Sequence, residues 1–391
     1  MIYSTLNNHA LGPPFTHPTL PNVAHFIGAI TPRSSPAHYL DAVMALIQSY
    51  RLDIQTPDVD LADEHESRIS DVIPLVVNTM GWSKGLGADL TQRIEDMLDP
   101  TDIFDIKGPG SSREQYPIAN YNQRSRYAAC SNMSMVDESL ARLHELQPVV
   151  SSSSAAGYTP ADHRTLSILS YFHASFPLDI IISSLLNQIT ARSWDTSRPL
   201  CAIPPYEVDC TVAIDKVILM GAGSEDVVEE EIGVVLNAAI VGMVRCDPGA
   251  IDVENNTDCC ILSTGINYTR YFAPPSPSSS NCVGIALIRG ISPPIRNDPP
   301  VPTKTYLHLL TPLPHSHLAG ARVLVKGEME LPVWGMLDFR NFDGGKGVSF
   351  GDVAGVEHNK VPFLQWGKTP EGAMGADKKR VRRNLMRRGQ M

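Results

Sequence analysis

Three apolar stretches in the second half of the chain decide its predicted fold: residues 283–289 read VGIALIR, residues 306–310 read YLHLL and residues 323–330 read VLVKGEME. Each is short and rich in β-branched, leucine or tyrosine side chains, which is typical of strands. The same reasoning predicts strands at residues 212–220, 259–262, 333–339 and 348–350. Pro/Ser/Gly stretches separate these segments, and residues 343–347 (DGGKG) are typical of a hairpin loop.

Helical patterns dominate before residue 250. Ser35 followed by Pro36 is typical of a helix start, and the apolar residues from Tyr39 to Tyr50 share one helical face. Capping signals and periodicity predict further helices at residues 89–98, 135–147, 159–172, 177–189 and 224–243. Helices first and strands later predict an α+β fold, with a helix-rich N-terminal half and an antiparallel strand-rich, proline-rich C-terminal half.

The predicted organisation has five parts. They are an extended N-terminal arm (1–34), a helical region (35–150), a mixed α/β region after a serine-rich linker (151–250), a strand-rich region (251–376) and a basic C-terminal tail (377–391). A length of 391 residues suits two or three packing units, and a hydrophobic content of 43% can supply their cores.

Charge is distributed unevenly along the chain. The net charge is −10, yet seven of the 32 Lys and Arg residues fall within residues 378–391, which leaves 25 against 42 acidic residues in the remainder. An acidic body should repel nucleic acid, and a basic tail should attract it. The tail therefore gives the candidate residues for binding RNA or an acidic neighbouring subunit: Lys378, Lys379, Arg380, Arg382, Arg383, Arg387 and Arg388. A nuclear import signal and a solvated chain end are the alternatives.

Two glycine-containing segments bear on nucleotide binding. Gly221-Ala222-Gly223 lies between a predicted strand and a predicted helix, but the third glycine of a dinucleotide loop is replaced by Asp226, whose charge opposes phosphate. Residues 350–357 (FGDVAGVE) resemble the segment that precedes the phosphate loop of membrane-anchored AAA proteases. The loop itself, Gly-x4-Gly-Lys-Ser/Thr, is absent from the 391 residues, so no nucleotide or other cofactor is predicted.

The tightest histidine group is His308, His315 and His317, and these are weak candidates for metal ligands. The sequence of residues 315–317 resembles the His-x-His of cupins, which implies a metal site. The glutamate that cupins place a few residues later is missing, because Ala321 and apolar neighbours occupy those positions. No Gly-x-Ser-x-Gly elbow or other complete nucleophile context is present, so no catalytic residue is predicted.

These patterns favour a structural protein over an enzyme. We expect a capsid or clamp protein of an icosahedral RNA virus, whose partners are copies of itself or another shell protein and, through the tail, RNA. The alternatives are an enzyme of unknown class with a histidine-rich site in the C-terminal half, and a nuclear or ribonucleoprotein adaptor. Because no signal peptide or spanning segment is recognised and no Cys-x-x-Cys occurs, we expect a cytoplasmic or virion location without membrane contact, with the nucleus as the alternative.

Overall fold

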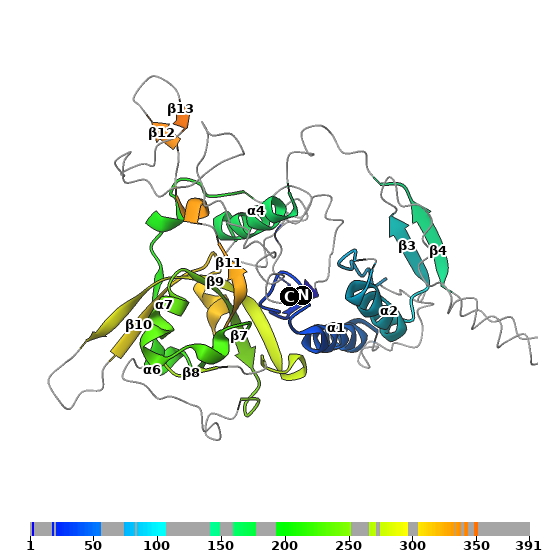
Figure 1. Cartoon of the computed structure of the whole chain (residues 1–391), viewed down its shortest axis with the longest axis horizontal. Coiled ribbons are helices and arrows are strands. Elements are labelled where there is room, and N and C mark those ends of the chain that lie inside the picture. The colour runs from blue at the N-terminus through cyan, green and yellow to red at the C-terminus, as the bar shows by residue number, and fades with distance from the viewer. Residues whose placement is uncertain are drawn as a thin grey trace, which may run out of the picture.

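Figure 1 shows a computed structural model of the chain, in which a seven-stranded mixed sheet is the largest element. The structure describes residues 2–3, 18, 21–55, 74–82, 84–106, 141–148, 159–176, 193–251, 266–270, 274–295, 304–331, 333–337, 340–342 and 348–350. Helices α1 and α2 lie beside the main sheet, and a two-stranded ribbon lies beyond α2.

The main sheet has the spatial order β5, β10, β9, β7, β11, β6, β8. Its strands are β5 (Tyr206–Asp209), β6 (Lys216–Leu219), β7 (Ala239–Cys246), β8 (Tyr268–Thr269), β9 (Ser280–Ile295), β10 (Lys304–Leu310) and β11 (Val323–Glu330). Neighbours pair antiparallel from β5 to β11, and parallel from β11 through β6 to β8.

Both faces of the sheet are covered, because consecutive residues of its inner strands belong to different core clusters. Val241, Ile288 and Leu324 lie in the largest cluster, whereas their neighbours Leu287 and Val325 lie in two others. A strand that is buried on both faces is apolar in nearly every position, as β6 and β7 are. The largest cluster therefore lies on one face of the sheet, and the others on its opposite face and end.

Longer helices pack beside the sheet. They are α1 (Pro36–Tyr50), which continues as a π-helix (Arg51–Gln55), α2 (Leu86–Leu98) and α4 (Pro160–His173). Leu40, Val43 and Ile47 of α1 pack against Leu90 and Ile94 of α2. The start of α4 is fixed by a capping box, in which the Thr159 and Asp162 side chains each accept a hydrogen bond from the other residue's backbone N–H.

Shorter elements complete the described structure. Two helices are α6 (Cys210–Ala213) and α7 (Ile232–Leu236), and the 3-10 turns are Leu200–Ala202, Ser224–Asp226, Glu229–Glu231, Pro277–Ser279, His315–Leu318 and Val333–Met336. Three small ribbons pair β1 (Ile2–Tyr3) with β2 (Val23–Ala24), β3 (Asp102–Ile106) with β4 (Arg142–Leu146), and β12 (Arg340–Phe342) with β13 (Val348–Phe350).

Residues 24–28, here named the crossing segment, run across three neighbouring strands of the sheet. The Ala24 N–H donates to the Asn281 side chain on β9 at 2.9 Å, and the Phe26 ring lies on Gly242 of β7. The Gly28 carbonyl then accepts from the Glu328 N–H of β11 at 2.6 Å. Ala24, Phe26 and Gly28 each contact the sheet. This alternation is typical of an extended chain, in which every second residue faces the same side.

Two glycines make this crossing possible. A Cβ on Gly242 would lie 2.4 Å from the Phe26 ring, and a Cβ on Gly327 would lie 2.0 Å from the Gly28 carbonyl oxygen. Gly28 itself has a φ of +74°, which side chains other than glycine rarely adopt. The two glycines of the sheet therefore leave the room that the Phe26 ring and the Gly28 backbone occupy.

Several predicted elements are confirmed. They include the helices now seen as α1, α2 and α4, and the strands at residues 283–289, 306–310, 323–330 and 348–350. The coarse α+β prediction holds in that helices accompany a seven-stranded sheet. The sheet is mixed, however, because β11, β6 and β8 run parallel. The helix-rich N-terminal half is not confirmed.

Four local predictions were wrong. Residues 224–243 were expected to form one helix, but they contain two 3-10 turns, the short α7 and the start of β7, because their apolar run fits a doubly buried strand as well as a helix. Residues 142–146 form β4, where a helix was expected. The strand predicted at 212–220 begins only at Lys216, and residues 333–336 form a 3-10 turn.

Other predictions fall outside the described residues. These are the serine-rich linker, the helix at 177–189, the strand at 259–262 and the whole basic tail. The five-part domain organisation stays a prediction. Within the described part of the chain, none of the helices has both the length and the apolar character that crossing a membrane requires.

Replacing Gly327 by Ala should destabilise the fold, because the new Cβ would overlap the Gly28 backbone, which cannot move aside as a side chain could. Overpacking of this kind costs about 1–3 kcal/mol. Gly233→Ala is the matched control, since a Cβ there meets nothing within 4 Å and lies in a helix. Urea unfolding of both variants measures the difference, and equal midpoints would contradict the close contact.

Candidate functional site

The β3–β4 ribbon brings together a carboxylate, a guanidinium, an imidazole and an aromatic ring. In the parallel register Asp102 lies beside Arg142, and Phe104 beside His144. Positions two apart on a strand point to the same side, so these four side chains share one face of the ribbon. We call this group the Asp102 cluster.

The Asp102 carboxylate contacts both basic side chains of the cluster. Arg142 Nε lies 3.0 Å from Asp102 Oδ1, and Arg142 Nη2 donates to Oδ2 at 3.0 Å. His144 Nε2 lies 2.8 Å from the same Oδ1. The His144 ring also stacks on Phe104, with centroids 4.8 Å apart and planes 17° from parallel. Asp102 therefore orients both basic side chains, and the stack holds the imidazole from its other side.

Electrostatics keep this carboxylate ionised. Hydrogen bonds from His144 and then from Arg142 lower the pKa of Asp102 below its ordinary value. The cluster is nevertheless open to solvent, since the Arg142 side chain is 73% exposed and the Phe104 residue 61%. Such a surface presents an ion-paired guanidinium beside an exposed aromatic ring, and these are the kinds of group that contact the phosphates and bases of single-stranded nucleic acid.

A second polar group lies where the crossing segment meets α1 and β9. A small cavity with room for roughly one water is lined by His25, His38, Ser280, Cys282, Phe26, Val244, Val325 and two prolines. Burial lowers the pKa of His25 to about 4, lowers that of His38 and raises that of Cys282 to about 11. All of these groups are therefore neutral near pH 7, as expected of a packing contact.

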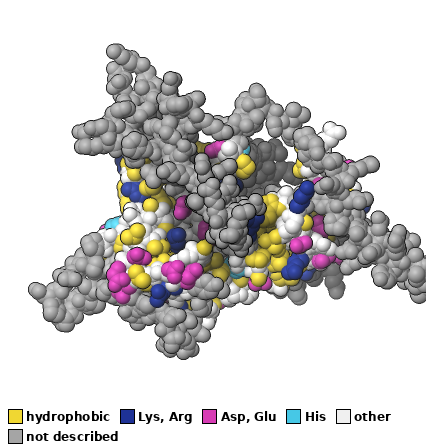
Figure 2. Space-filling model, in the orientation of Figure 1, with side chains coloured by type: hydrophobic (Ala, Val, Ile, Leu, Met, Phe, Trp, Pro, Cys, Tyr) yellow, Lys and Arg dark blue, Asp and Glu magenta, His cyan; other side chains and the backbone are white. Residues whose placement is uncertain are grey.

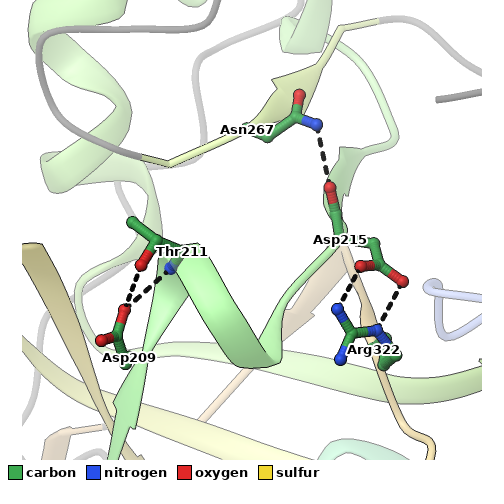
Figure 3. Close-up of polar contacts among 5 residues, drawn as sticks. All are labelled: Asp209, Thr211, Asp215, Asn267 and Arg322. Atoms are coloured by element: carbon green, nitrogen blue, oxygen red, sulfur yellow. Dashed lines mark hydrogen bonds and ion pairs between the residues drawn. The ribbon is translucent and has the colours of Figure 1, made fainter. Parts of the chain in front are cut away.

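A third group of polar contacts ties strands of the sheet together, as Figure 3 shows. Arg322 donates from Nε and Nη2 to the two oxygens of Asp215, at 2.7 and 2.5 Å, and the Asn267 amide donates to the Asp215 carbonyl at 2.8 Å. Nearby, Asp209 accepts from the backbone and hydroxyl of Thr211 and so begins α6. Asp215 thus links the segments that lead into β6, β8 and β11, and this is a structural role.

The predicted histidine group does not assemble. His308 lies in β10 with its Nε2 2.7 Å from the Ser292 hydroxyl of β9, whereas His315 and His317 lie in a separate 3-10 turn. No group of three His, Cys, Asp or Glu side chains among the described residues could hold a metal ion. The tail residues Lys378–Arg388 lie outside the described part, so their binding role stays a prediction.

The sequence reasoning missed the Asp102 cluster. Its four members come from two strands separated by 35 residues that were not paired in the prediction, and residues 142–146 were assigned to a helix. The sequence did hold one signal. Asp102 and Phe104 are two positions apart, and so are Arg142 and His144, so each pair lies on one face of a strand. That signal gains meaning only when the parallel register is known.

Comparisons with known proteins connect the chain to polynucleotide kinases. Residues 4–174 match the family described as the mRNA cleavage and polyadenylation factor CLP1 P-loop. The chain is similar to polynucleotide 5′-hydroxyl-kinase GRC3 of Cryptococcus neoformans var. neoformans serotype D (strain B-3501A), with 35% identity over 98% of this chain and 49% of the relative. Similarity to grc3 of Schizosaccharomyces pombe is 26% over 98% of this chain and 47% of the relative. The chain thus spans about half the length of these relatives.

These matches overturn the expected function. The prediction of a structural capsid or clamp protein was wrong, as were the predictions of shell-protein partners and of no enzymatic activity. The relatives are named as kinases, and they align over almost the whole chain. Proline-rich segments and a basic tail misled the prediction, since they are compositional features that proteins of many functions share. The expected location was not tested and stays a prediction.

The pH dependence of stability should report the burial of His25. Because the pKa of about 4 in the folded chain lies below the ordinary value of 6.5, the unfolded chain binds more protons between these pH values. Stability should therefore fall as the pH drops, by about 2 kcal/mol between pH 7 and pH 5 from this group.

Urea unfolding at the two pH values measures this loss. His25→Phe should lose less stability than the wild type over the interval, whereas the exposed control His315→Phe should behave as the wild type does. The same loss in His25→Phe and wild type would show that His25 titrates normally in the folded chain.

Proposed function

We propose that this chain forms part of a polynucleotide 5′-hydroxyl kinase. The observation that carries the proposal is the 35% identity to the Cryptococcus kinase over 98% of the chain. In the reaction, the 5′ hydroxyl oxygen bonds to the γ-phosphorus of a nucleoside triphosphate, the bond to the β-phosphate oxygen breaks, and the hydroxyl proton passes to a base. The products are a 5′-phosphorylated polynucleotide and the nucleoside diphosphate.

The residues present indicate which part of such a kinase this chain would supply. Transfer requires a loop that holds the donor's phosphates, and Gly-x4-Gly-Lys-Ser/Thr does not occur in them. The chain spans 49% of the Cryptococcus relative. We infer that this chain contributes contacts to the polynucleotide, and that the phosphate loop is supplied by other polypeptide.

The Asp102 cluster is the surface that best fits the polynucleotide. It lies within the family-matched residues, and it offers Arg142 for a phosphate and Phe104 for a base. Figure 2 shows acidic side chains gathered in the region where Figure 1 labels α6. Glu225, Asp226 and residues 229–231 form two acidic 3-10 turns that precede α7 in the chain. The acidic surface repels a polyanion, and this repulsion favours binding of the polynucleotide to another part of the molecule.

A chimaera tests the kinase assignment. In it, this chain replaces the matched half of the Cryptococcus enzyme. The chimaera should transfer labelled γ-phosphate from ATP to a 5′-hydroxyl oligonucleotide, whereas this chain alone should transfer none because it lacks the phosphate loop. A folded chimaera without any transfer, beside an active parent enzyme, would refute the assignment.

Substitution of Arg142 should weaken polynucleotide binding. Losing one phosphate contact to a single strand should make the negative slope of log K against log salt shallower by about 0.7. Arg142→Ala should also reduce the affinity about fivefold to tenfold at low salt. Arg142→Lys should restore much of the salt dependence, because it restores the charge.

Arg93→Ala is the matched control, since Arg93 is an exposed arginine on α2 and not on the β3–β4 ribbon. Fluorescence anisotropy with a 5′-labelled strand measures all variants, and circular dichroism checks that they are folded. Equal affinities and slopes for Arg142→Ala and Arg93→Ala would exclude the Asp102 cluster from the interface.

A further inference from the structure

An exposed tryptophan lies beside the end of α4. Trp194 is 38% exposed, although the segments on both sides of it are anchored in the core. Leu200 is fully buried, and its carbonyl accepts a hydrogen bond from Arg289 Nη1 of β9 at 2.8 Å. Phe172 of α4 lies in the same apolar cluster as Leu200. The indole is therefore exposed on a part of the chain that is otherwise well packed.

Backbone and ring contacts fix the orientation of this tryptophan. Ala174 and Trp194 form an isolated antiparallel bridge, and the Asp195 N–H donates to the His173 carbonyl at 2.7 Å. In return, His173 Nδ1–H donates to the Asp195 carbonyl at 2.9 Å. The His173 and Trp194 rings stack with their centroids 6.2 Å apart and their planes 18° from parallel. We call these two rings the Trp194 platform.

Charges beside the Trp194 platform are close to balanced. Hydrogen bonds from Ser197 lower the pKa of Asp195, and interactions with His173 and Arg198 lower it further. An ionised Asp195 therefore lies near the exposed guanidinium of Arg198, and the two charges offset each other. A ligand of the Trp194 platform must consequently bind through its aromatic surface rather than through its net charge.

The chemistry of the platform fits an unpaired nucleobase. Every base has a flat π-face that stacks on aromatic side chains, and this stacking needs neither a charge nor a particular sequence. Tryptophan combines a large apolar face with a low cost in conformational freedom, because its side chain has few rotatable bonds. The relatives of this chain are named as polynucleotide kinases, so a single strand is the ligand with such bases that their names supply.

We propose that the open face of Trp194 stacks a base of single-stranded polynucleotide, at a point separate from the Asp102 cluster. The inference rests on the proposed function, because that function supplies the strand. In Figure 1, α4 and the β3–β4 ribbon lie apart, so a strand must extend across the molecule to reach both. The Trp194 platform thus adds affinity for longer strands.

Loss of the indole should weaken strand binding without changing its salt dependence. Trp194→Leu should reduce the affinity about fivefold to a hundredfold, because one base loses its stacking partner. The slope of log K against log salt should stay unchanged, since no phosphate contact is lost. Trp194→Phe should retain most of the affinity, because it retains a ring. Fluorescence anisotropy with a labelled single strand measures both quantities.

Two controls test whether the loss reflects stacking. Tyr206→Leu should bind as the wild type does, since Tyr206 is an aromatic residue of similar exposure, 37%, on β5. A strand of abasic nucleotides keeps its phosphates but offers no base, so wild type and Trp194→Leu should bind it equally. Unchanged affinity of Trp194→Leu for the ordinary strand, or a loss of affinity for the abasic strand, would overturn the proposal.

Crosslinking tests the unaltered chain, and it applies even if Trp194→Leu does not fold. A single strand that contains 5-bromouridine should crosslink on irradiation to Trp194, in the tryptic peptide of residues 193–198. Mass spectrometry identifies the modified peptide. Crosslinks confined to other peptides would overturn the proposal.

This inference and the kinase assignment can fail separately. An inactive chimaera whose strand binding still depends on Trp194 would refute the kinase assignment and support the stacking. An active chimaera whose strand binding is the same with Trp194→Leu would support the kinase assignment and overturn the stacking. Loss of a protein partner in Trp194→Leu, with unchanged strand affinity, would also overturn it and would assign the Trp194 platform to a protein interface.

Discussion

The backbone contact between Gly28 and the β11 strand is the constraint on which much of the structure depends. Where the Gly28 carbonyl meets the Glu328 N–H, two backbones approach without side chains between them, and any larger residue at position 327 would separate them. The contact orients Phe26 onto Gly242 and brings His25 beside His38 of α1. It therefore connects the family-matched residues 4–174 to a sheet whose strands all lie beyond residue 174 in the chain.

The two sides of this contact differ in how they are stabilised. The sheet buries apolar side chains on both faces and needs few polar ties, of which Asp215 with Arg322 is the clearest. On the other side, α1 and α2 share a small apolar contact, and the β3–β4 ribbon depends on backbone pairing and the exposed Asp102 cluster. Exposed ion pairs contribute little, about 0–1 kcal/mol each. The part that carries the Asp102 cluster is thus the less stable one.

Local signals in the sequence were sufficient for elements whose pattern is self-contained. Ser35-Pro36 marked α1, Thr159 with Asp162 marked α4, and apolar runs marked β9, β10 and β11. They failed where the outcome depends on distant partners: residues 239–243 become a strand because β9 and β11 flank them. The Asp102 cluster was inaccessible for the same reason, since a parallel pair brings together residues that no turn connects.

The crossing segment also affects the order in which the chain can fold. Ala24 bonds to a residue 257 positions away, and Gly28 to one 300 positions away. During synthesis at 5–20 residues per second, residues 24–28 must wait roughly 15–60 s before their partners exist. Until then His25 and Phe26 are exposed to water, because the strands that bury them do not yet exist. The docking of this early segment therefore follows the synthesis of β11, and chaperones would have access to the segment during that interval.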